Sequence, residues 1–352
     1  MDVATARALC ALNNEFYARE ASSFSATREA PWPGWRRVLG HIAIAQGDEG
    51  ISRGGTFASG CQAFDWRGEG GGDSRPSRIG FEACTDGAVP GSTASKVRGR
   101  ASTLSVLDVA CGNMRFERFL DAEYPGEFLS LAVDSCDRLA LDALSAYVFE
   151  RAEVSYTHID AIERLLDGGV QGLAFSLGTK SADAAVGFGF MHHIPGGENR
   201  VNFIRALLET VRPGGIVAVS LWRFMDDERL AKKAREATDR AQSYVTDAVV
   251  GHTPLDDGTD CVLPDERAGR ASLDEESARS PLFAIDFTQF EAGDYLLGWQ
   301  NDTAAFRYCH SFSDEEIETL ILAVGDRAHL IDRFTADGKA GNLNEYLVFC
   351  RK

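Results

Sequence analysis

Long apolar runs, paired cysteines and a secretory leader are all missing from this sequence. No apolar run is long enough to cross a bilayer, and the segment that begins at Met1 has neither the basic start nor the hydrophobic centre of a signal peptide. The eight cysteines are widely spaced and form no C-x-x-C pair, so neither a zinc ribbon nor a disulfide framework is indicated. We therefore expect a cytoplasmic protein with free thiols, no membrane partner and no metal site.

Positive charge is also scarce. The 352 residues include 36 Lys and Arg against 53 Asp and Glu, which gives a formal net charge of −17. Such a charge repels a phosphate backbone, and no basic stripe with interleaved aromatic residues offsets it. Arg19, Arg28, Arg36 and Arg37 could form a local basic cluster, although a solvated helix face gives the same pattern. The composition thus gives no support for direct RNA binding.

Hydrophobic periodicity divides the chain into three regions. Residues 1–46 are expected to form a helical cap, with amphipathic helices over Thr5–Ser22 and Gly34–Ala45. Residues 47–102 are rich in Gly, Ser and Arg and lose all periodicity, which predicts a disordered insertion. Residues 103–352 then read as the main domain, because apolar content there is ample for a substantial core.

The main domain contains two further segments without clear periodicity. One covers Asp167–Ser181, and the other, which is acidic and punctuated by proline, lies near residues 251–282. We interpret both as insertions into the domain, and the core is expected to resume around Phe283.

The most informative stretch is Ser105–Phe116, in which a β-prone apolar strand breaks into a glycine turn and a helix. Gly112 lets the backbone approach a ligand closely, and Asn113 can cap a helix whose N-terminal amides favour a polar or anionic group. Doubly wound sheets build a nucleotide pocket in this way, at the carboxyl end of a strand.

Acidic residues follow the next two strands at corresponding places. A strand over Phe128–Val133 ends in Asp134, about 25 residues after Asp108, near where dinucleotide folds place the carboxylate that holds ribose hydroxyls. The following strand, Val154–His158, is succeeded by Asp160. One such Asp alone is more easily explained as a helix N-cap. Three strand ends with polar groups in register favour a shared ligand site.

The rest of the main domain continues the alternation of strands and helices. Further strands are expected over Asp183–Phe190, Ile216–Ser220, Leu330–Phe334 and Glu345–Cys350. Helices are expected over Phe116–Glu123, Arg138–Phe149, Gly197–Val211 and Asp226–Val245, and a capping box at Ser313–Glu316 begins a helix that ends near Gly325.

From Thr103 to the C-terminus, apart from the insertions, the chain resembles the class I S-adenosylmethionine-dependent methyltransferases. The resemblance implies a doubly wound, Rossmann-like α/β fold with a mostly parallel seven-stranded sheet, one antiparallel strand and the order 3-2-1-4-5-7-6. It implies S-adenosyl-L-methionine as the cofactor. It assigns Asp108, Ala110 and Gly112 to the methionine portion, Asp134 to the ribose, and Asp160 with Ala161 to adenine, and it implies that Phe190 helps to close the pocket. Further candidates for the cofactor site are Asn113, Ser135 and Arg28, the last for the cofactor carboxylate.

The chain departs from that family at two positions of the glycine loop. The family usually has glycine at the first and third positions, whereas this chain has Ala110 and Met114. We expect these side chains to narrow the room around the ligand's carboxylate and amine.

A narrower resemblance comes from both ends of the chain. Several segments are similar to parts of the methyltransferases that esterify carboxymethyl-uridine at the tRNA wobble position: Phe16–Tyr17, Phe24–Arg28, Pro31–Pro33, Asp294–Trp299 and Phe306–Phe312, together with the pair His192–His193. That resemblance implies tRNA as the methyl acceptor and a small zinc-binding activator protein as a partner.

A sulfonium cofactor already carries an activated methyl group, so the protein mainly positions the reactants. A carboxylate nucleophile needs only a cationic clamp, for which Arg28 and Arg307 have the right chemistry. A hydroxyl or amine needs a base such as a histidine. The candidate catalytic residues are therefore His192, His193, Arg307, Tyr308 and His310, each of which could instead be a packed core residue.

Two other functions stay open at this point. The acidic charge favours a small-molecule O- or N-methyltransferase over one that acts on RNA. A cofactor-binding scaffold without turnover is the third possibility, and Ala110 and Met114 are the only motive for it.

Overall fold

A computed structural model describes the chain except for residues 48–102, 179, 252–279 and 300–301. The insertion expected over residues 47–102, and nearly all of that expected near residues 251–282, lie outside the described residues. Among the helices that the structure describes, none combines the length and the apolar character needed to cross a membrane.

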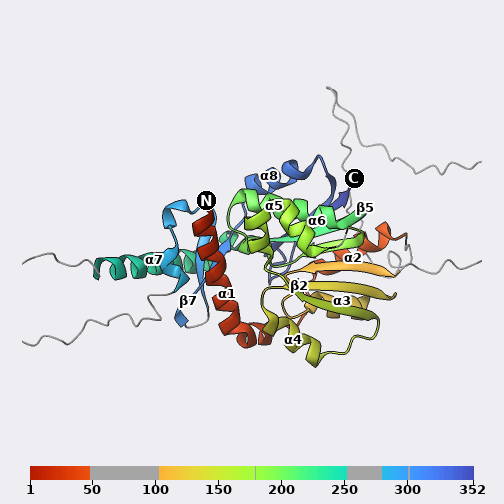
Figure 1. The fold of residues 1–352 in the computed structure, drawn as a ribbon, viewed down its shortest axis with the longest axis horizontal. Coiled ribbons are helices and arrows are strands. Elements are labelled where there is room, and N and C mark those ends of the chain that lie inside the picture. The colour runs from red at the N-terminus through yellow and green to blue at the C-terminus, as the bar shows by residue number, and fades with distance from the viewer. Residues whose placement is uncertain (48–102, 179, 252–279, 300–301) are drawn as a thin grey trace, which may run out of the picture.

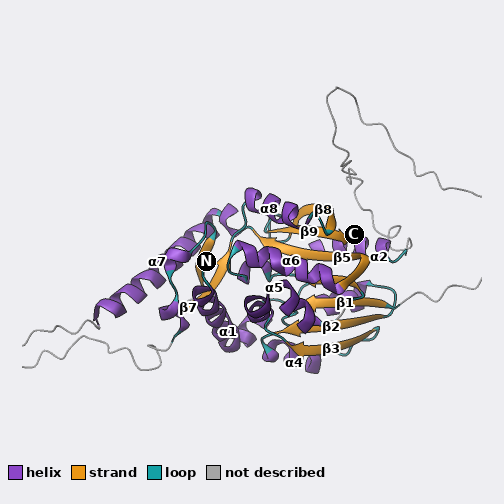
Figure 2. Ribbon diagram, turned by 45° about the horizontal axis from the view of Figure 1, so that its top comes forward, coloured by secondary structure: helices purple, strands orange, loops and turns teal. Residues whose placement is uncertain are grey.

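The centre of the molecule is a seven-stranded sheet (Figure 2). Its strands are β1 (Leu104–Val109), β2 (Phe128–Asp134), β3 (Ala152–His158), β4 (Ala182–Gly187), β5 (Val211–Trp222), β8 (Ala328–Ala336) and β9 (Asn344–Arg351). They lie in the order β3-β2-β1-β4-β5-β9-β8, and β9 alone in this sheet runs antiparallel to its neighbours. Counted within the sheet, this order is 3-2-1-4-5-7-6, so the predicted class I methyltransferase fold is confirmed.

Helices cover both faces of the sheet, because the parallel strands are apolar on both sides. On one face, α2 (Gly34–Ala45), α3 (Arg115–Glu123) and α4 (Asp137–Ala146) pack against side chains such as Phe128 and Ala132. On the other face lie α5 (Ala161–Leu177), α6 (Gly197–Thr210) and α8 (Asp314–Val324) (Figure 2), and their apolar side chains form the larger core cluster with those of the sheet. The layers are therefore helix, sheet and helix, as in doubly wound folds.

A second unit of structure lies beside the carboxyl ends of the strands. The strands β6 (Asp294–Trp299) and β7 (Asp302–His310) form an antiparallel pair that packs against α1 (Val3–Ala26) and α7 (Glu228–Gly251). The helix α1 begins at an N-cap, since the side chain of Asp2 accepts the Thr5 N–H at 2.7 Å. Figure 1 shows α1 crossing the end of the sheet and α7 extending away from the body.

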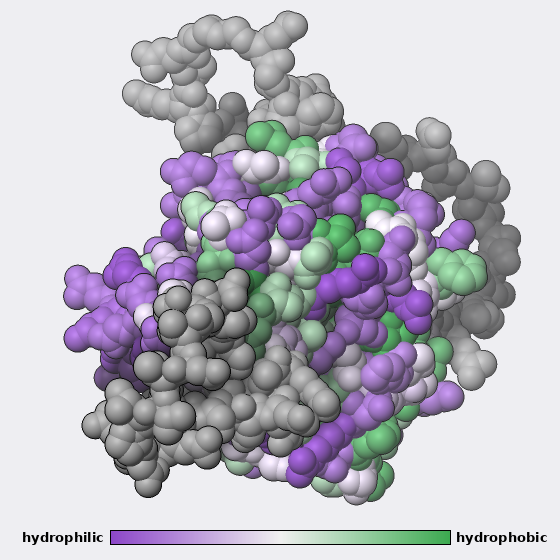
Figure 3. Space-filling view, turned by 60° about the vertical axis from the view of Figure 1, so that its left-hand side comes forward, coloured by the Kyte–Doolittle hydropathy of each residue, from purple (hydrophilic) through white to green (hydrophobic). Residues whose placement is uncertain are grey.

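The surface is hydrophilic over most of the face drawn in Figure 3, with small apolar areas between the polar side chains. Large apolar residues with substantial exposure, such as Phe175 and Leu322, lie on different helices of the outer layer. Five cysteines are described, and all are free thiols, as predicted.

Two local predictions were wrong, and a third was correct only in part. The segment Asp167–Ser181 is not a separate insertion, because α5 continues into it as far as Leu177, past a kink at Gly169, where φ is 57°. Asn113 does not cap α3, since the left-handed residue Met114 stands at the N-cap without a side-chain hydrogen bond. At the predicted capping box, Ser313 accepts the Glu316 N–H, but the Glu316 side chain turns to other partners.

Candidate functional site

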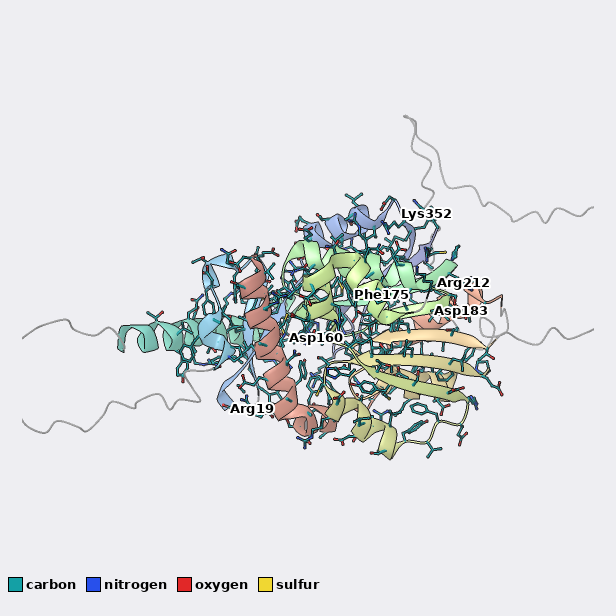
Figure 4. All side chains as sticks on the ribbon, in the orientation of Figure 1. Arg19, Asp160, Phe175, Asp183, Arg212 and Lys352 are labelled. Atoms are coloured by element: carbon teal, nitrogen blue, oxygen red, sulfur yellow. The ribbon has the colours of Figure 1, made fainter. Side chains whose placement is uncertain are left out.

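A cavity of about 330 Å³ lies along the carboxyl ends of β1 to β5 and is closed by α1 and by the loop before β9. All ten residues predicted for the cofactor line this cavity, as do His192, His193 and Arg307. Figure 4 shows Asp160 at the end of the sheet beside α1, whereas Asp183 and Arg212 mark the opposite end. The cavity therefore occupies the place where open α/β sheets bind their ligands.

The glycine loop and the end of β2 are joined by hydrogen bonds to one carboxylate. Asp134 accepts the Gly112 N–H at Oδ2 and the Cys136 N–H at Oδ1, both at 2.8 Å. Each oxygen keeps a second lone pair, which leaves the carboxylate able to accept ligand hydroxyls. Gly112 has a φ of 55°, and a Cβ placed on it would meet no atom within 4 Å, so its backbone opens directly onto free space. The loop thus fits a ligand that approaches the main chain closely.

The two departures from the glycine-loop pattern keep the backbone conformation that glycine would adopt. Ala110 has a φ of 65° and Met114 a φ of 55°, so both are left-handed despite their side chains. Met114 is fully buried against Ala132 and Ala140 and does not line the cavity. The expectation that Met114 narrows the pocket was therefore wrong.

The helix α1 closes the cavity over the ends of β2 and β3. Asn14 donates to Asp160 Oδ2 at 2.8 Å and accepts from Ser135 Oγ at 3.2 Å. The other oxygen of Asp160 accepts the Ile162 and Glu163 N–H groups, so Asp160 is an N-cap of α5 as well as a cavity residue. Asn113 donates its amide to the Arg28 carbonyl at 3.1 Å and so joins the glycine loop to the segment after α1.

A buried carboxyl pair lies directly beneath the loop and was missed from the sequence. Asp108 is 3% exposed and Glu117 of α3 is fully buried, with Ser130 Oγ donating to Glu117 Oε1 at 3.2 Å. Burial raises the pKa of Glu117 to about 7. Burial, followed by the neighbouring Glu117 carboxyl, raises the pKa of Asp108 well above its usual range. The pair therefore holds a proton near neutral pH. Its signal in the sequence was an acidic residue on the apolar face of the helix, between Phe116 and Leu120.

The wall of the cavity formed by β5, β7 and the turn after β4 is rich in hydrogen-bond donors. Arg28 and Arg307 form no ion pair with a carboxylate within the described part of the chain, and their guanidinium groups lie over aromatic rings instead. Arg28 is 3.7 Å from the Phe24 ring centre, and Arg307 is 5.1 Å from that of Trp299. Burial, followed by the charge of Arg307, lowers the pKa of Arg28 to about 10, which leaves Arg28 charged at neutral pH.

Three buried nitrogen atoms on this wall have no hydrogen-bond partner among the described residues. They are Arg307 Nε, Trp222 Nε1 and His192 Nδ1. Burial lowers the pKa of His192 well below its usual range, so this imidazole is neutral. Since buried polar groups are normally satisfied, these atoms indicate where a polar ligand group belongs.

His193 is neutral as well, and both of its nitrogen atoms are engaged. Its Nδ1 lies 2.9 Å from the Tyr308 carbonyl oxygen, and its Nε2 lies 2.8 Å from the Tyr17 hydroxyl. Burial lowers the pKa of His193 to about 3. His193 therefore does not offer a free nitrogen to a substrate.

His192, His193 and Cys309 have potential ligand atoms within 4.8 Å of one another. Nevertheless, His193 Nδ1, the nitrogen 3.9 Å from Cys309 Sγ, is hydrogen bonded to a carbonyl. Burial also raises the pKa of the Cys309 thiol to about 11. With Arg307 adjacent, this arrangement does not fit a metal cation.

Tyr308 and His310 lie outside the cavity, which corrects their assignment as catalytic residues. Side chains alternate along a strand, so Arg307 and Tyr308 of β7 point to opposite faces. The Tyr308 hydroxyl donates to Asp294 at 2.7 Å, and His310 bridges Asp294 and Glu316 at 2.7 and 2.6 Å. Burial alone would lower the pKa of His310, but these two carboxylates raise it.

The proposed basic cluster is largely neutralised by surface ion pairs. Arg19 pairs with Glu20, Arg36 with Glu123, and Arg37 with Asp332. This pattern is that of a solvated surface with mixed charges. Arg28 is the member of the cluster that reaches the cavity.

No known family model and no curated protein matches the sequence. Solved structures with a similar arrangement include a SAM-dependent methyltransferase from Methanosarcina mazei, with 13% identity, coverage of 71% of this chain and 92% of that chain, and a TM-score of 0.44. An O-methyltransferase family protein from Burkholderia thailandensis has 12% identity, covers 72% and 52%, and has a TM-score of 0.38. The N-methyltransferase NodS from Bradyrhizobium japonicum, in complex with S-adenosyl-L-homocysteine, has 10% identity, covers 71% and 79%, and has a TM-score of 0.36. At such identities these matches concern the fold, which the strand order defines independently.

Proposed function

We propose that this protein is an S-adenosylmethionine-dependent methyltransferase whose acceptor presents a carboxylate. The observation that carries the proposal is the polarity of the cavity. One end has an open glycine loop and the Asp134 carboxylate, and the other has two arginines without carboxylate partners in the described structure.

The first end fits the cofactor that the family resemblance implies. Asp134 can accept two ribose hydroxyls, the open main chain at Gly112 suits the methionine portion, and Ala161 lines the region assigned to adenine. Asp108, which lines the cavity beside the buried Glu117, offers a partner for an ammonium group.

The second end fits an anion. In a chain of net charge −17, it is unusual that the buried Arg307 and the half-buried Arg28 have no acidic partner among the described residues, because charged groups are rarely left unpaired in an interior. The Arg28 carbonyl oxygen accepts a hydrogen bond from Asn113 of the glycine loop, so the Arg28 guanidinium group can instead bind the carboxylate of the cofactor. We therefore assign the acceptor carboxylate to Arg307, with Trp222 Nε1 and His192 Nδ1 beside it.

The chemistry needs little acid or base from the protein. When bound, the cofactor supplies an electrophilic methyl group whose bond to sulfur breaks with its electron pair as a carboxylate oxygen attacks, giving a methyl ester and a neutral thioether. No proton has to be removed, in keeping with the neutral and fully engaged His193. The residues of the chain hold the acceptor in line and exclude water with the aromatic groups around Arg307.

Two kinds of acceptor fit this proposal. The segments Phe24–Arg28 and Phe306–Phe312, which resemble the tRNA wobble carboxymethyl-uridine methyltransferases, each contribute an arginine to the cavity, and this supports a carboxymethyl-uridine acceptor with a zinc-binding activator as partner. A small carboxylic acid is the second candidate, favoured by the neutralised surface arginines and the net charge of −17.

Methyl transfer from tritium-labelled cofactor to these acceptors tests the proposal. The purified protein is assayed with a panel of small carboxylic acids, and with tRNA that bears carboxymethyl-uridine, with and without the activator. A carboxylate acceptor yields a methyl ester, whose label is released by mild alkali. Alkali-stable label would contradict the carboxylate, and cofactor binding without transfer to any acceptor would favour the scaffold.

Two arginine variants sharpen this test. Arg307→Gln is expected to raise the KM for the acceptor about ten- to a hundredfold, the usual loss for a charge-assisted hydrogen bond, and to leave cofactor affinity unchanged. Arg36→Gln is the matched control, because Arg36 is paired with Glu123 on the surface. Equal changes in the KM for the acceptor in the two variants would contradict the assignment of Arg307 to the acceptor site.

A further inference from the structure

The protonation state of His193 follows from its two hydrogen bonds. A carbonyl oxygen can only accept, so the contact of 2.9 Å between Nδ1 and the Tyr308 carbonyl places the imidazole proton on Nδ1. The Asn13 amide nitrogen, 3.3 Å from the same Nδ1, donates to the same carbonyl at 3.2 Å. Nε2 is therefore the acceptor atom of His193, and Tyr17 must donate its only hydroxyl proton to it, at 2.8 Å.

With its proton directed at His193, the Tyr17 oxygen can offer only lone pairs to the cavity. Tyr17 lines that cavity. It lies one turn of α1 after Asn14, which binds Ser135 and Asp160, and its own carbonyl oxygen contacts Cys136 Sγ at 3.8 Å. Tyr17 thus spans the distance from the loop after β2 to the turn after β4.

This position lies between the two ends of the site. Asp134 and Gly112 mark the cofactor end, and Arg307 marks the acceptor end. Arg28, Arg307 and Asp134 all act electrostatically on the Tyr17 hydroxyl, and burial raises the pKa of that hydroxyl to about 12, so it stays a neutral phenol. Through its contacts with Cys136 and His193, Tyr17 therefore belongs to the part of the cavity between the cofactor end and the acceptor end.

We propose that the Tyr17 oxygen, oriented by His193, is the acceptor group that recognises the positively charged sulfonium and its methyl group. The inference rests on the function proposed above. The unpartnered Arg307 Nε and Trp222 Nε1 on the neighbouring wall can only donate, so Tyr17 supplies lone pairs that a polarised methyl group requires there. His193 is then a positioning residue that holds the phenol in place and takes no proton from the substrate.

A Tyr17 oxygen in this role affects the affinity for S-adenosylmethionine more than that for S-adenosylhomocysteine. S-adenosylmethionine carries the positive sulfonium and the methyl group, whereas S-adenosylhomocysteine lacks both. An oxygen aimed at these groups stabilises the first ligand and contributes little to the second. A merely structural tyrosine affects both ligands equally.

Calorimetric titration of the full chain with both ligands separates these roles. Tyr17→Phe is expected to raise the dissociation constant of S-adenosylmethionine about two- to fivefold, which is the range of a contact between a polarised C–H group and oxygen. The dissociation constant of S-adenosylhomocysteine is expected to change by less than about 1.5-fold. His193→Leu removes the acceptor of the Tyr17 proton and is expected to give the same selective loss. The double variant is expected to lose no more than either single variant, because both changes remove one oriented oxygen.

Tyr147→Phe is the matched control, since it removes a hydroxyl that donates to Asp121 away from the cavity. It is expected to bind both ligands like the unsubstituted protein. Equal weakening of both ligands by Tyr17→Phe, or no weakening of either, would overturn the inference and leave the proposed function standing. Failure of the unsubstituted protein to bind either ligand would overturn the proposed function, and the inference with it.

Discussion

Substitution of Glu117 by glutamine is expected to change how the stability of the protein depends on pH. Glu117 is fully buried next to Asp108, and burial raises its pKa from 4.5 to about 7. The folded protein therefore holds a proton on Glu117 that the unfolded chain has already released over this range. Because the folded pKa is the higher one, the stabilising contribution is complete below pH 4.5 and is lost as pH rises towards and through 7.

The size of the effect follows from the shift. One pKa unit corresponds to 1.36 kcal/mol, so the full cost of ionising Glu117 in the folded state is about 3 kcal/mol. Between about pH 5.5 and pH 8, the two-state linkage relation gives about 2 kcal/mol of this cost. Glu117→Gln keeps the shape and a hydrogen-bonding amide but cannot ionise. Its stability relative to the unsubstituted protein should therefore rise by that amount over the same interval.

Urea unfolding at several pH values between about 5.5 and 8, followed by circular dichroism, measures this difference directly. Glu123→Gln serves as the control, because Glu123 lies on the same helix as Glu117 but pairs with Arg36 at the surface. Stability curves for Glu117→Gln and the unsubstituted protein that stay parallel across this range would refute the buried, proton-holding pair.

Two further predictions concern the packing around the cavity. His310 is held between Asp294 and Glu316, which raise its pKa against the effect of burial, so its contribution to stability is complete below its unfolded pKa of 6.5 and is lost as pH rises through the higher folded value. His310→Gln should accordingly lower the melting temperature more at pH 6 than at pH 9, and an equal loss at both values would contradict a protonated His310. Gly189 has a φ of 69°, and a Cβ there would lie 3.0 Å from the Trp32 ring. Gly189→Ala should cost about 1–2 kcal/mol of unfolding free energy in urea titrations, whereas an unchanged midpoint would show that this turn adapts.

Much of the cofactor end could be predicted from the sequence because its signals are local. A strand, a glycine turn and a helix in succession predicted the cavity position of Asp108 and Gly112, and the alternation of strands placed Asp134 and Asp160 at the same edge. The strand order itself came from the family resemblance, since periodicity does not reveal which strands are neighbours. The structure confirms that order.

The errors also have local causes. The segment from Asp167 was interpreted as an insertion, yet the apolar side chains after Gly169 bury in the core cluster and continue α5. At the glycine loop, Met114 was expected to enter the pocket, but its left-handed backbone turns the side chain into the core.

The acceptor end was harder to predict because it depends on contacts between distant segments. Arg307 comes from the C-terminal part of the chain, His193 from its middle and Tyr17 from its N-terminal helix, yet all three line one cavity. The alternation along β7 explains which of its polar residues belong to the site: Arg307 faces the cavity, and Tyr308 does not. Counting this alternation from Arg307 would have removed Tyr308 and His310 from the candidates.

The central claim is that this cavity binds S-adenosylmethionine through Asp134. Calorimetric titration of the purified protein with S-adenosylmethionine and S-adenosylhomocysteine, beside the Asp134→Asn variant, tests it most directly. We predict dissociation constants in the micromolar range for the unsubstituted protein and a loss of about ten- to a hundredfold in the variant, since the charged acceptor of the ribose hydroxyls is gone. No binding by the unsubstituted protein, or equal affinity in Asp134→Asn, would contradict the assignment.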